Sequence, residues 1–206
     1  SWLAAIVALK GKCSALPWDI VVSYAYDARG LEVCRTVPYA VAASHNAFHT
    51  AACDTKSRTT TTYDALGRVT SVTTPDNVTT RTEYAVATNV TVNSHSRFLL
   101  TTVYDGNDHQ TARYSDVFGR LALVREITGD TWTDGAPTEY AAYADTRYSY
   151  DAADNLLAVA TSTASDGPPG SFLRETTIGY DALGRKTSMN DQDMGVWAYS
   201  YGGAGN

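Results

Sequence analysis

The chain of 206 residues has few charged side chains, which make up 18% of it. Lys and Arg together number 16 against 22 Asp and Glu, so the formal net charge is −6. A nucleic-acid partner requires a basic face, so this acidic balance argues against one. The 44% of hydrophobic residues also argues against intrinsic disorder, which needs low hydrophobicity and high net charge.

The sequence has no long hydrophobic run. Residues 2–9 are apolar but end at Lys10, which is too short for a transmembrane helix. As a signal-peptide core this run lacks a preceding basic region and a clear cleavage site. We expect an edge strand or a frayed end, leave residues 1–17 unassigned, and expect no membrane span.

Catalytic signatures are also missing. The sequence has no Gly-x-Ser-x-Gly nucleophile motif and no glycine-rich phosphate loop. We therefore predict that the protein is not an enzyme, has no catalytic residue and binds no cofactor.

Cysteine is scarce and odd in number, with Cys13, Cys34 and Cys53. At least one thiol must remain unpaired, and a large sheet does not need the disulfides of small secreted domains. We expect these cysteines to be small buried hydrophobic residues, and their redox state is left open.

The feature that organises the sequence is a repeated hexapeptide. Tyr63-Asp64-Ala65-Leu66-Gly67-Arg68 occurs again, unchanged, at positions 180–185. Degraded copies begin at Tyr26, Tyr104, Tyr114 and Tyr150. Tyr63 to Tyr84 and Tyr180 to Tyr201 both span 21 residues, so the basic unit has about 20 residues.

Each hexapeptide predicts a tight hairpin turn. The Asp64 carboxylate can accept hydrogen bonds from backbone N–H groups two residues on, which favours a type I turn. Gly67 then supplies the positive φ of a G1 bulge. Thr-rich, alternating segments flank the turn on both sides and predict strands.

The resulting prediction is an all-β fold of consecutive antiparallel hairpins that form a curled sheet. Residues 18–58 form a degenerate repeat with an Ala-rich insertion at 39–52, either a short helix or irregular. Residues 59–206 form the regular repeat region. The expected strands include 18–27, 31–37, 59–63, 69–73, 78–84, 90–92, 98–104, 110–114, 121–128, 142–150, 156–163, 172–180, 186–189 and 196–201.

The two Tyr-Asp-Ala-Leu-Gly-Arg copies and their Thr/Ser/Val strands resemble the YD-repeat, or RHS-repeat, family. This family includes RHS polymorphic toxins, the B and C components of insecticidal toxin complexes, SpvB-like proteins and teneurins. The segment from Asp191 to Tyr201 resembles a repeat ending. The resemblance covers residues 59–206 well, residues 20–58 less well, and nothing before them.

The resemblance implies a segment of a YD/RHS β-shell whose wall encloses a C-terminal toxin in a larger, secreted bacterial protein. The expected partners are flanking repeats of the same chain and the enclosed polypeptide. The alternative is an extracellular carbohydrate-binding or cell-adhesion module. The chain does not begin with Met and its last repeat looks unfinished, so we expect a fragment that is poorly soluble alone because its sheet edges are open.

Two groups of residues have side chains that can bind a metal ion. His45, His49 and Cys53 are each four residues apart and would share a helix face, with Asp54 as a possible fourth zinc ligand. No Cys-x-x-Cys pair supports a site, so we expect ordinary loop or core residues. Asp105, Asn107 and Asp108 resemble a calcium loop, but no Glu follows where the bidentate ligand belongs. We expect turn residues there.

Two further groups could carry function. Asp191 and Asp193 could form a carboxylate pair for glycoside chemistry, but a hairpin turn explains them. The recurrent tyrosines, such as Tyr84 and Tyr104, could stack on sugar rings. We favour a cross-strand aromatic ladder, because each Tyr recurs at the same place before a turn.

Overall fold

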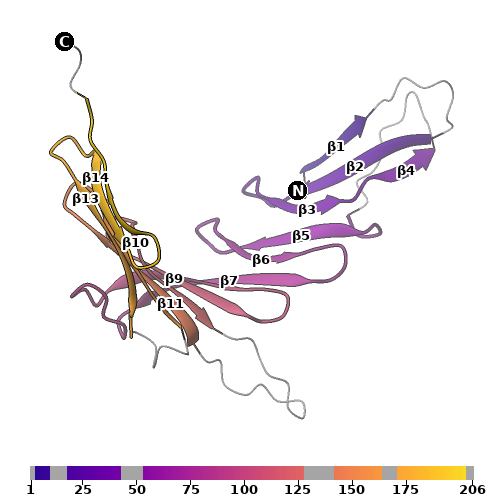
Figure 1. Cartoon of the computed structure of the whole chain (residues 1–206). Coiled ribbons are helices and arrows are strands. Elements are labelled where there is room, and N and C mark those ends of the chain that lie inside the picture. The colour runs from indigo at the N-terminus through magenta and orange to yellow at the C-terminus, as the bar shows by residue number, and fades with distance from the viewer. Residues whose placement is uncertain (1–2, 10–17, 43–52, 128–141, 164–170, 203–206) are drawn as a thin grey trace. The chain divides into compact units, whose positions relative to one another are not determined.

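The computed structural model describes residues 3–9, 18–42, 53–127, 142–163 and 171–202 (Figure 1). These residues form β-strands joined by turns, and no helix occurs among them. No segment of this part of the chain forms an apolar helix long enough to cross a membrane. The predicted all-β class is confirmed.

The chain divides into two compact units, residues 1–82 and 83–206. The first unit contains β1 (Leu3–Leu9), β2 (Trp18–Tyr26), β3 (Glu32–Thr36), β4 (Tyr39–Ala42), β5 (Arg58–Tyr63) and β6 (Val69–Thr73). Strand β7 (Thr79–Ala87) crosses the boundary. The second unit contains β8 (Phe98–Tyr104), β9 (Gln110–Ser115), β10 (Leu121–Ile127), β11 (Ala142–Tyr150), β12 (Leu156–Thr163), β13 (Arg174–Tyr180), β14 (Lys186–Asp191) and β15 (Gly195–Ala198).

Strand pairing in the first unit follows the chain, with one exception. The order is β1-β2-β3-β5-β6, and every pair is antiparallel. Strand β4 also pairs with β2, because Pro38 interrupts the returning strand and leaves β3 and β4 on the same edge of β2. Strand β1 is the predicted edge strand, whereas residues 39–42 of the Ala-rich segment are a strand rather than a helix. The rest of that segment lies outside the described residues.

In the second unit the strands from β8 to β15 pair consecutively and antiparallel. Because successive strands turn back on each other, each neighbouring pair lies side by side (Figure 1). The predicted consecutive hairpins are therefore confirmed within both units.

One predicted strand is wrong. Residues 90–92 form a loop, with only an isolated bridge between Val92 and His95. Val92 is buried with Phe98 and Leu123 in the hydrophobic core of the second unit. Tertiary packing has overridden the β-propensity of Val90-Thr91-Val92.

The core of the second unit lies on one face of the sheet. Leu100, Tyr114 and Leu123 follow one another across β8, β9 and β10 in register, and the Phe98 ring meets the Tyr114 ring edge to face at 6.2 Å. Because side chains alternate along a strand, this row fixes which residues of β10 and β11 face inward. The core of the first unit is smaller and partly polar, with Val21 and Ser23 fully buried on β2.

Candidate functional site

Seven turns share one geometry, which is the predicted one. In each, the fourth residue donates its N–H to the carbonyl of the first, and the first donates its own N–H to the carbonyl of the fifth. The fourth residue has positive φ in every case. The first and fourth residues are Asp27 and Gly30, Asp64 and Gly67, Thr74 and Asn77, Asp105 and Asp108, Asp116 and Gly119, Asp151 and Asp154, and Asp181 and Gly184.

The first Asp of the turn holds it closed from within. Asp64 Oδ1 accepts the backbone N–H groups of Leu66 and Arg68 at 2.9 Å each, while Oδ2 accepts Arg68 Nε at 2.7 Å. The same set joins Asp181 to Leu183 and Arg185. We call this arrangement the Asp clip. It explains why the Asp-x-x-Gly-Arg motif begins with Asp and ends with Arg.

The Asp clip keeps its carboxylate ionised. The hydrogen bond from the Arg68 backbone N–H lowers the pKa of Asp64, and the Arg68 side chain and Leu66 N–H lower it further. The corresponding bonds from Arg185 lower the pKa of Asp181. A carboxylate whose two oxygens accept these hydrogen bonds stabilises the turn that contains it.

Four of the repeat tyrosines connect one hairpin to the hairpin before it. Each donates its hydroxyl to the backbone carbonyl at the start of the neighbouring hairpin's outgoing strand. The pairs are Tyr63 to Glu32 (2.7 Å), Tyr150 to Leu121 (3.1 Å), Tyr180 to Leu156 (3.1 Å) and Tyr201 to Lys186 (2.7 Å). We call these bonds the tyrosine ties. These four tyrosines bond through their hydroxyls, and the predicted aromatic ladder stays a prediction.

Arginine side chains add further links between hairpins. Arg120 Nη1 donates to the carbonyl of Asp151 at 3.2 Å and to Asp154 Oδ1 at 2.8 Å, and its guanidinium lies 5.2 Å from the Tyr150 ring centroid. In the first unit Arg29 Nη1 donates to the carbonyl of Asp64 at 2.6 Å. These bonds join turn residues that are 31 and 35 positions apart in the sequence.

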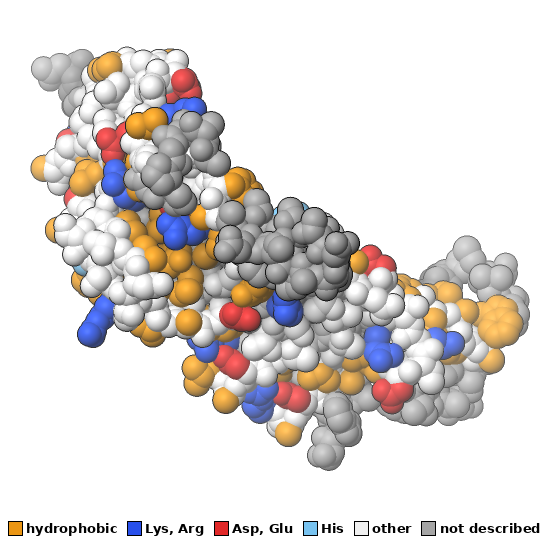
Figure 2. Space-filling view, turned by 90° about the horizontal axis from the view of Figure 1, so that it is seen from below, with side chains coloured by type: hydrophobic (Ala, Val, Ile, Leu, Met, Phe, Trp, Pro, Cys, Tyr) orange, Lys and Arg blue, Asp and Glu red, His pale blue; other side chains and the backbone are white. Residues whose placement is uncertain are grey.

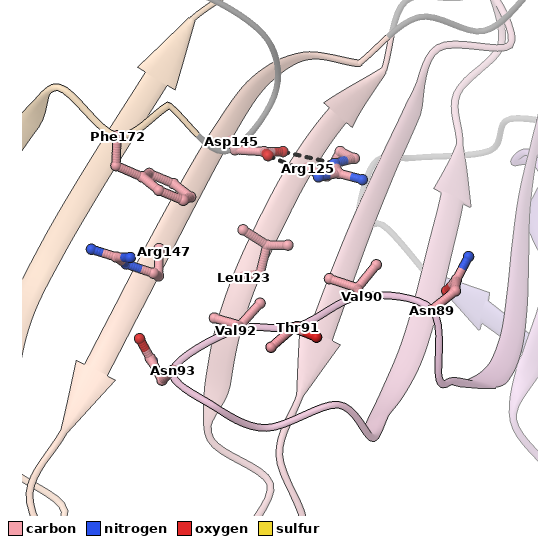
Figure 3. Close-up of a pocket in the computed structure, with 10 residues that line it drawn as sticks. All are labelled: Asn89, Val90, Thr91, Val92, Asn93, Leu123, Arg125, Asp145, Arg147 and Phe172. Carbon is pink, nitrogen blue, oxygen red and sulfur yellow. Dashed lines mark hydrogen bonds and ion pairs between the residues drawn. The ribbon is translucent and has the colours of Figure 1, made fainter.

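A pocket of about 270 Å³ lies in the second unit (Figure 3). It is lined by residues 89–93, which precede β8, by Leu123 and Arg125 of β10, by Asp145 and Arg147 of β11, and by Phe172. Asp145 is only 2% exposed and accepts Arg125 Nε at 2.8 Å and Nη2 at 2.9 Å. The hydrogen bonds that Arg125 donates to Asp145 raise the pKa of Arg125.

Sequence reasoning missed this pocket. Arg125 and Asp145 are directly opposite in the register of β10 and β11. Charges of opposite sign at inward positions of two successive strands were the available signal. It could be used only after the register was known, because a shift of one residue moves a side chain to the other face.

A second hollow of about 480 Å³ is lined by residues of β9, β10 and β11 near the 105–109 turn. Tyr143 and Glu126 share a hydrogen bond there that raises the pKa of Tyr143. Elsewhere on the surface, acidic and basic side chains are interspersed with hydrophobic ones on the face shown in Figure 2.

No protein-family model matches the chain, and no curated protein matches it. Solved structures give matches of low identity. The crystal structure of TcdB2-TccC3-Cdc42 is 17% identical over 97% of this chain and 11% of that chain, with a TM-score of 0.48. The crystal structure of TcdB2-TccC3 is 17% identical over 91% of this chain and 10% of that chain, with a TM-score of 0.49. The chain spans about a tenth of the length of these matches.

The zinc hypothesis fails at Cys53. Cys53 is bonded to Cys34 in a disulfide, so it has no thiolate to offer a metal. His45 and His49 lie outside the described residues. The disulfide also answers the question of redox state that the sequence left open for Cys34 and Cys53.

The other metal and carboxylate candidates are turn residues in the structure. Asp105 Oδ1 accepts the N–H groups of Asn107 and His109, and Asp108 is the positive-φ residue of that turn. Asp191 Oδ1 accepts the N–H groups of Asp193 and Met194. Within the described part of the chain, no three His, Cys, Asp or Glu residues gather as a metal site.

The tyrosines weighed for glycan stacking are Tyr84 and Tyr104. The Tyr104 hydroxyl donates to Glu83 Oε2 at 3.1 Å, and Tyr104 is the last residue of β8, whereas Tyr84 lies within β7. These positions do not test sugar binding by either ring, so the carbohydrate-binding alternative stays a prediction.

Proposed function

We propose that this chain is a structural segment of a YD/RHS-repeat wall that encloses a C-terminal toxin polypeptide in a larger secreted protein. The observation that supports the proposal is the series of tyrosine ties. A binding site would need a distinctive residue set at one place, whereas this chain repeats the same bond from hairpin to hairpin. Repetition of one interaction between neighbours is the design of a continuous wall.

The Asp clips support a structural role in the same way. Asp64, Asp116 and Asp181 each accept two backbone N–H groups and an Arg side chain. Carboxylates that are saturated by their own turn have no capacity left for acid–base catalysis. We therefore propose that the chain is not an enzyme.

The Cys34–Cys53 disulfide supports secretion. Disulfides persist in oxidising compartments and are rare in the cytosol of mesophiles. A chain that folds with this bond suits the extracellular or periplasmic side.

The test is protease protection in the natural protein that contains residues 1–206. The polypeptide that follows the repeats should resist limited proteolysis in the intact protein and become cleavable when Tyr150→Phe and Tyr180→Phe remove two ties. Tyr199→Phe is the matched control, because Tyr199 is partly exposed and is not one of the ties. Equal cleavage of the downstream polypeptide in the intact and the doubly substituted protein would contradict the wall hypothesis.

A further inference from the structure

The pocket in Figure 3 is built on the inward face of the sheet in the second unit. Leu123 is opposite Arg147, and Arg125 is opposite Asp145, so two successive inward positions of β10 and β11 form its floor. The loop of residues 89–93 crosses above these strands, and Phe172 lies beside Arg147 (Figure 3).

The loop over the pocket is held in place by its own turn. Asn93 and Ser94 both have positive φ, and Val92 and His95 exchange two backbone hydrogen bonds at 2.9 Å, as in a type I′ turn. Asn93 Nδ2 donates to the carbonyl of Tyr148 on β11 at 2.7 Å. Two non-glycine residues in a left-handed conformation are costly, and such conformations gather at ligand sites. The pocket is therefore preorganised.

Arg125 is already paired with a carboxylate of the protein. Two of its donors are held by the two oxygens of Asp145, at 2.8 and 2.9 Å, and the Asp145 side chain is 1% exposed. This pair is a bidentate ion pair that neutralises itself.

Arg147 is different, because it has a donor without an acceptor. Its Nε is buried and makes no hydrogen bond within the described part of the chain. Its Nη2 reaches Glu175 Oε1 only at 3.4 Å, and that carboxylate is 46% exposed. The Phe172 ring centroid lies 4.5 Å from Arg147 Cζ and fixes the guanidinium. A buried N–H without an acceptor costs free energy, which an acceptor that reaches Arg147 would recover.

The surrounding charges select the acceptor. Arg125 and Arg147 are balanced by Asp145 and Glu175, so a dianion would meet two carboxylates at short range. A singly charged, planar group matches the guanidinium fork and meets about half of that repulsion. The pocket volume of about 270 Å³ is below the roughly 300–1,000 Å³ of drug-sized ligand sites, so it suits a group of side-chain size.

We propose that this pocket binds a carboxylate group, and that Arg147, stacked on Phe172, is the residue that holds it. The carboxylate belongs either to a free small acid or to an Asp or Glu side chain of a polypeptide. This site is independent of the wall function proposed above, because it rests on one pocket rather than on the repeated ties.

The test is a titration of the chain with two probes, acetate and the capped tripeptide acetyl-Gly-Glu-Gly-amide. Binding is followed by the ¹⁵N–¹H signal of the arginine Nε–H groups and by calorimetry. We expect a saturable shift of one arginine Nε–H signal that Arg147→Gln removes. Saturation by acetate alone indicates a free acid, and tighter binding of the tripeptide indicates a polypeptide side chain.

Three variants make the result specific. Arg147→Gln should weaken binding about 10- to 100-fold, because it removes a charge-assisted hydrogen bond. Arg147→Lys keeps the charge but lacks the planar fork, so this variant should also bind the probes more weakly. Circular dichroism and an unchanged Asp145–Arg125 ion pair show that the variant is folded. Arg113→Gln should bind like the parent, because Arg113 is exposed on β9 and does not line the pocket.

Three outcomes would overturn the proposal. The first is no saturable shift with either probe, which would mean that water alone occupies the pocket. The second is equal binding by the Arg147→Gln variant. The third is tighter binding of inorganic phosphate than of acetate, which would contradict the selection of a singly charged ligand.

Discussion

The hydroxyl of Tyr150 donates a hydrogen bond to the backbone carbonyl of Leu121, 29 positions earlier in the chain. Tyr150 is the last residue of β11 and Leu121 is the first residue of β10. The bond therefore joins these two neighbouring strands at the ends that adjoin their turns. The Tyr150 ring also lies 5.2 Å from the Arg120 guanidinium, which clips the turn before β10. One side chain thus connects the strand pairing of one repeat to the turn of another.

Replacement of Tyr150 by Phe should destabilise the protein modestly. The ring remains in place while the hydrogen bond is lost, so we expect a decrease of about 0.5–1.5 kcal/mol in the free energy of unfolding. Urea denaturation measures this change. Tyr199→Phe should have less than half of the effect, and equal losses for the two variants would refute a special role for the ties.

Replacement of Gly67 by Ala tests the turn. Gly67 has φ +80°, and an added Cβ would lie 3.6 Å from Leu31 Cδ1, so space is sufficient and only the backbone conformation is strained. We expect a loss of about 1–2 kcal/mol in the free energy of unfolding. Gly67→Asn should cost less, because Asn tolerates this conformation better. Gly202→Ala, at a position without positive φ and with open space around it, should be neutral.

The Asp clips predict acid sensitivity. Because the hydrogen bonds from Arg185 lower the pKa of Asp181 in the folded state, the unfolded chain binds more protons than the folded chain at acidic pH. The stabilisation by Asp181 is therefore present above the unfolded pKa and is lost as the pH falls through the lower, folded pKa. Asp181→Asn should flatten this part of the stability curve between about pH 5 and pH 2. Asp193→Asn, at an exposed turn carboxylate, is the control.

The buried pair of Arg125 and Asp145 predicts the largest single effect. Asp145→Asn would leave the Arg125 charge without its partner, so we expect a loss of about 3–5 kcal/mol. Thermal or urea unfolding measures it. Arg125→Met combined with Asp145→Leu should recover much of the loss, since an apolar pair avoids the unpaired charge. A double variant as unstable as Asp145→Asn would contradict this account.

The disulfide predicts a dependence on reductant. Cys34 and Cys53 are separated by 19 residues, and closing a loop of that size stabilises a fold by about 3 kcal/mol in the chain-entropy model. Cys34→Ser combined with Cys53→Ser should lower the melting temperature, and dithiothreitol should then have no further effect. A melting temperature of the parent that is unaffected by dithiothreitol would argue that the bond contributes little.

The turns could be predicted from the sequence because their chemistry is local. Asp64 and Gly67 need only each other and the intervening backbone, and the structure has them as expected. The strands followed from their alternating Thr and Val. Where a strand was wrongly predicted, at residues 90–92, the deciding partner was Leu123, about 30 positions away and invisible to a local pattern.

The links between hairpins could not be predicted for the same reason. The tie from Tyr63 to Glu32 depends on the register between strands 31 positions apart, and the pocket depends on the register of β10 with β11. The disulfide was left open because an odd number of cysteines does not show which two are bonded, and a large sheet does not require such a bond.

The Asp clip has a consequence for how long such a chain can grow. In the clips of Asp64, Asp116 and Asp181 the anion and its Arg cation cancel within five residues, and the cation is held at 2.7 to 2.8 Å. Each added turn of this kind contributes no net charge, so lengthening the array adds no electrostatic repulsion that would oppose its compaction. Duplication of this turn therefore adds no net charge, which leaves the number of such turns free to change in evolution.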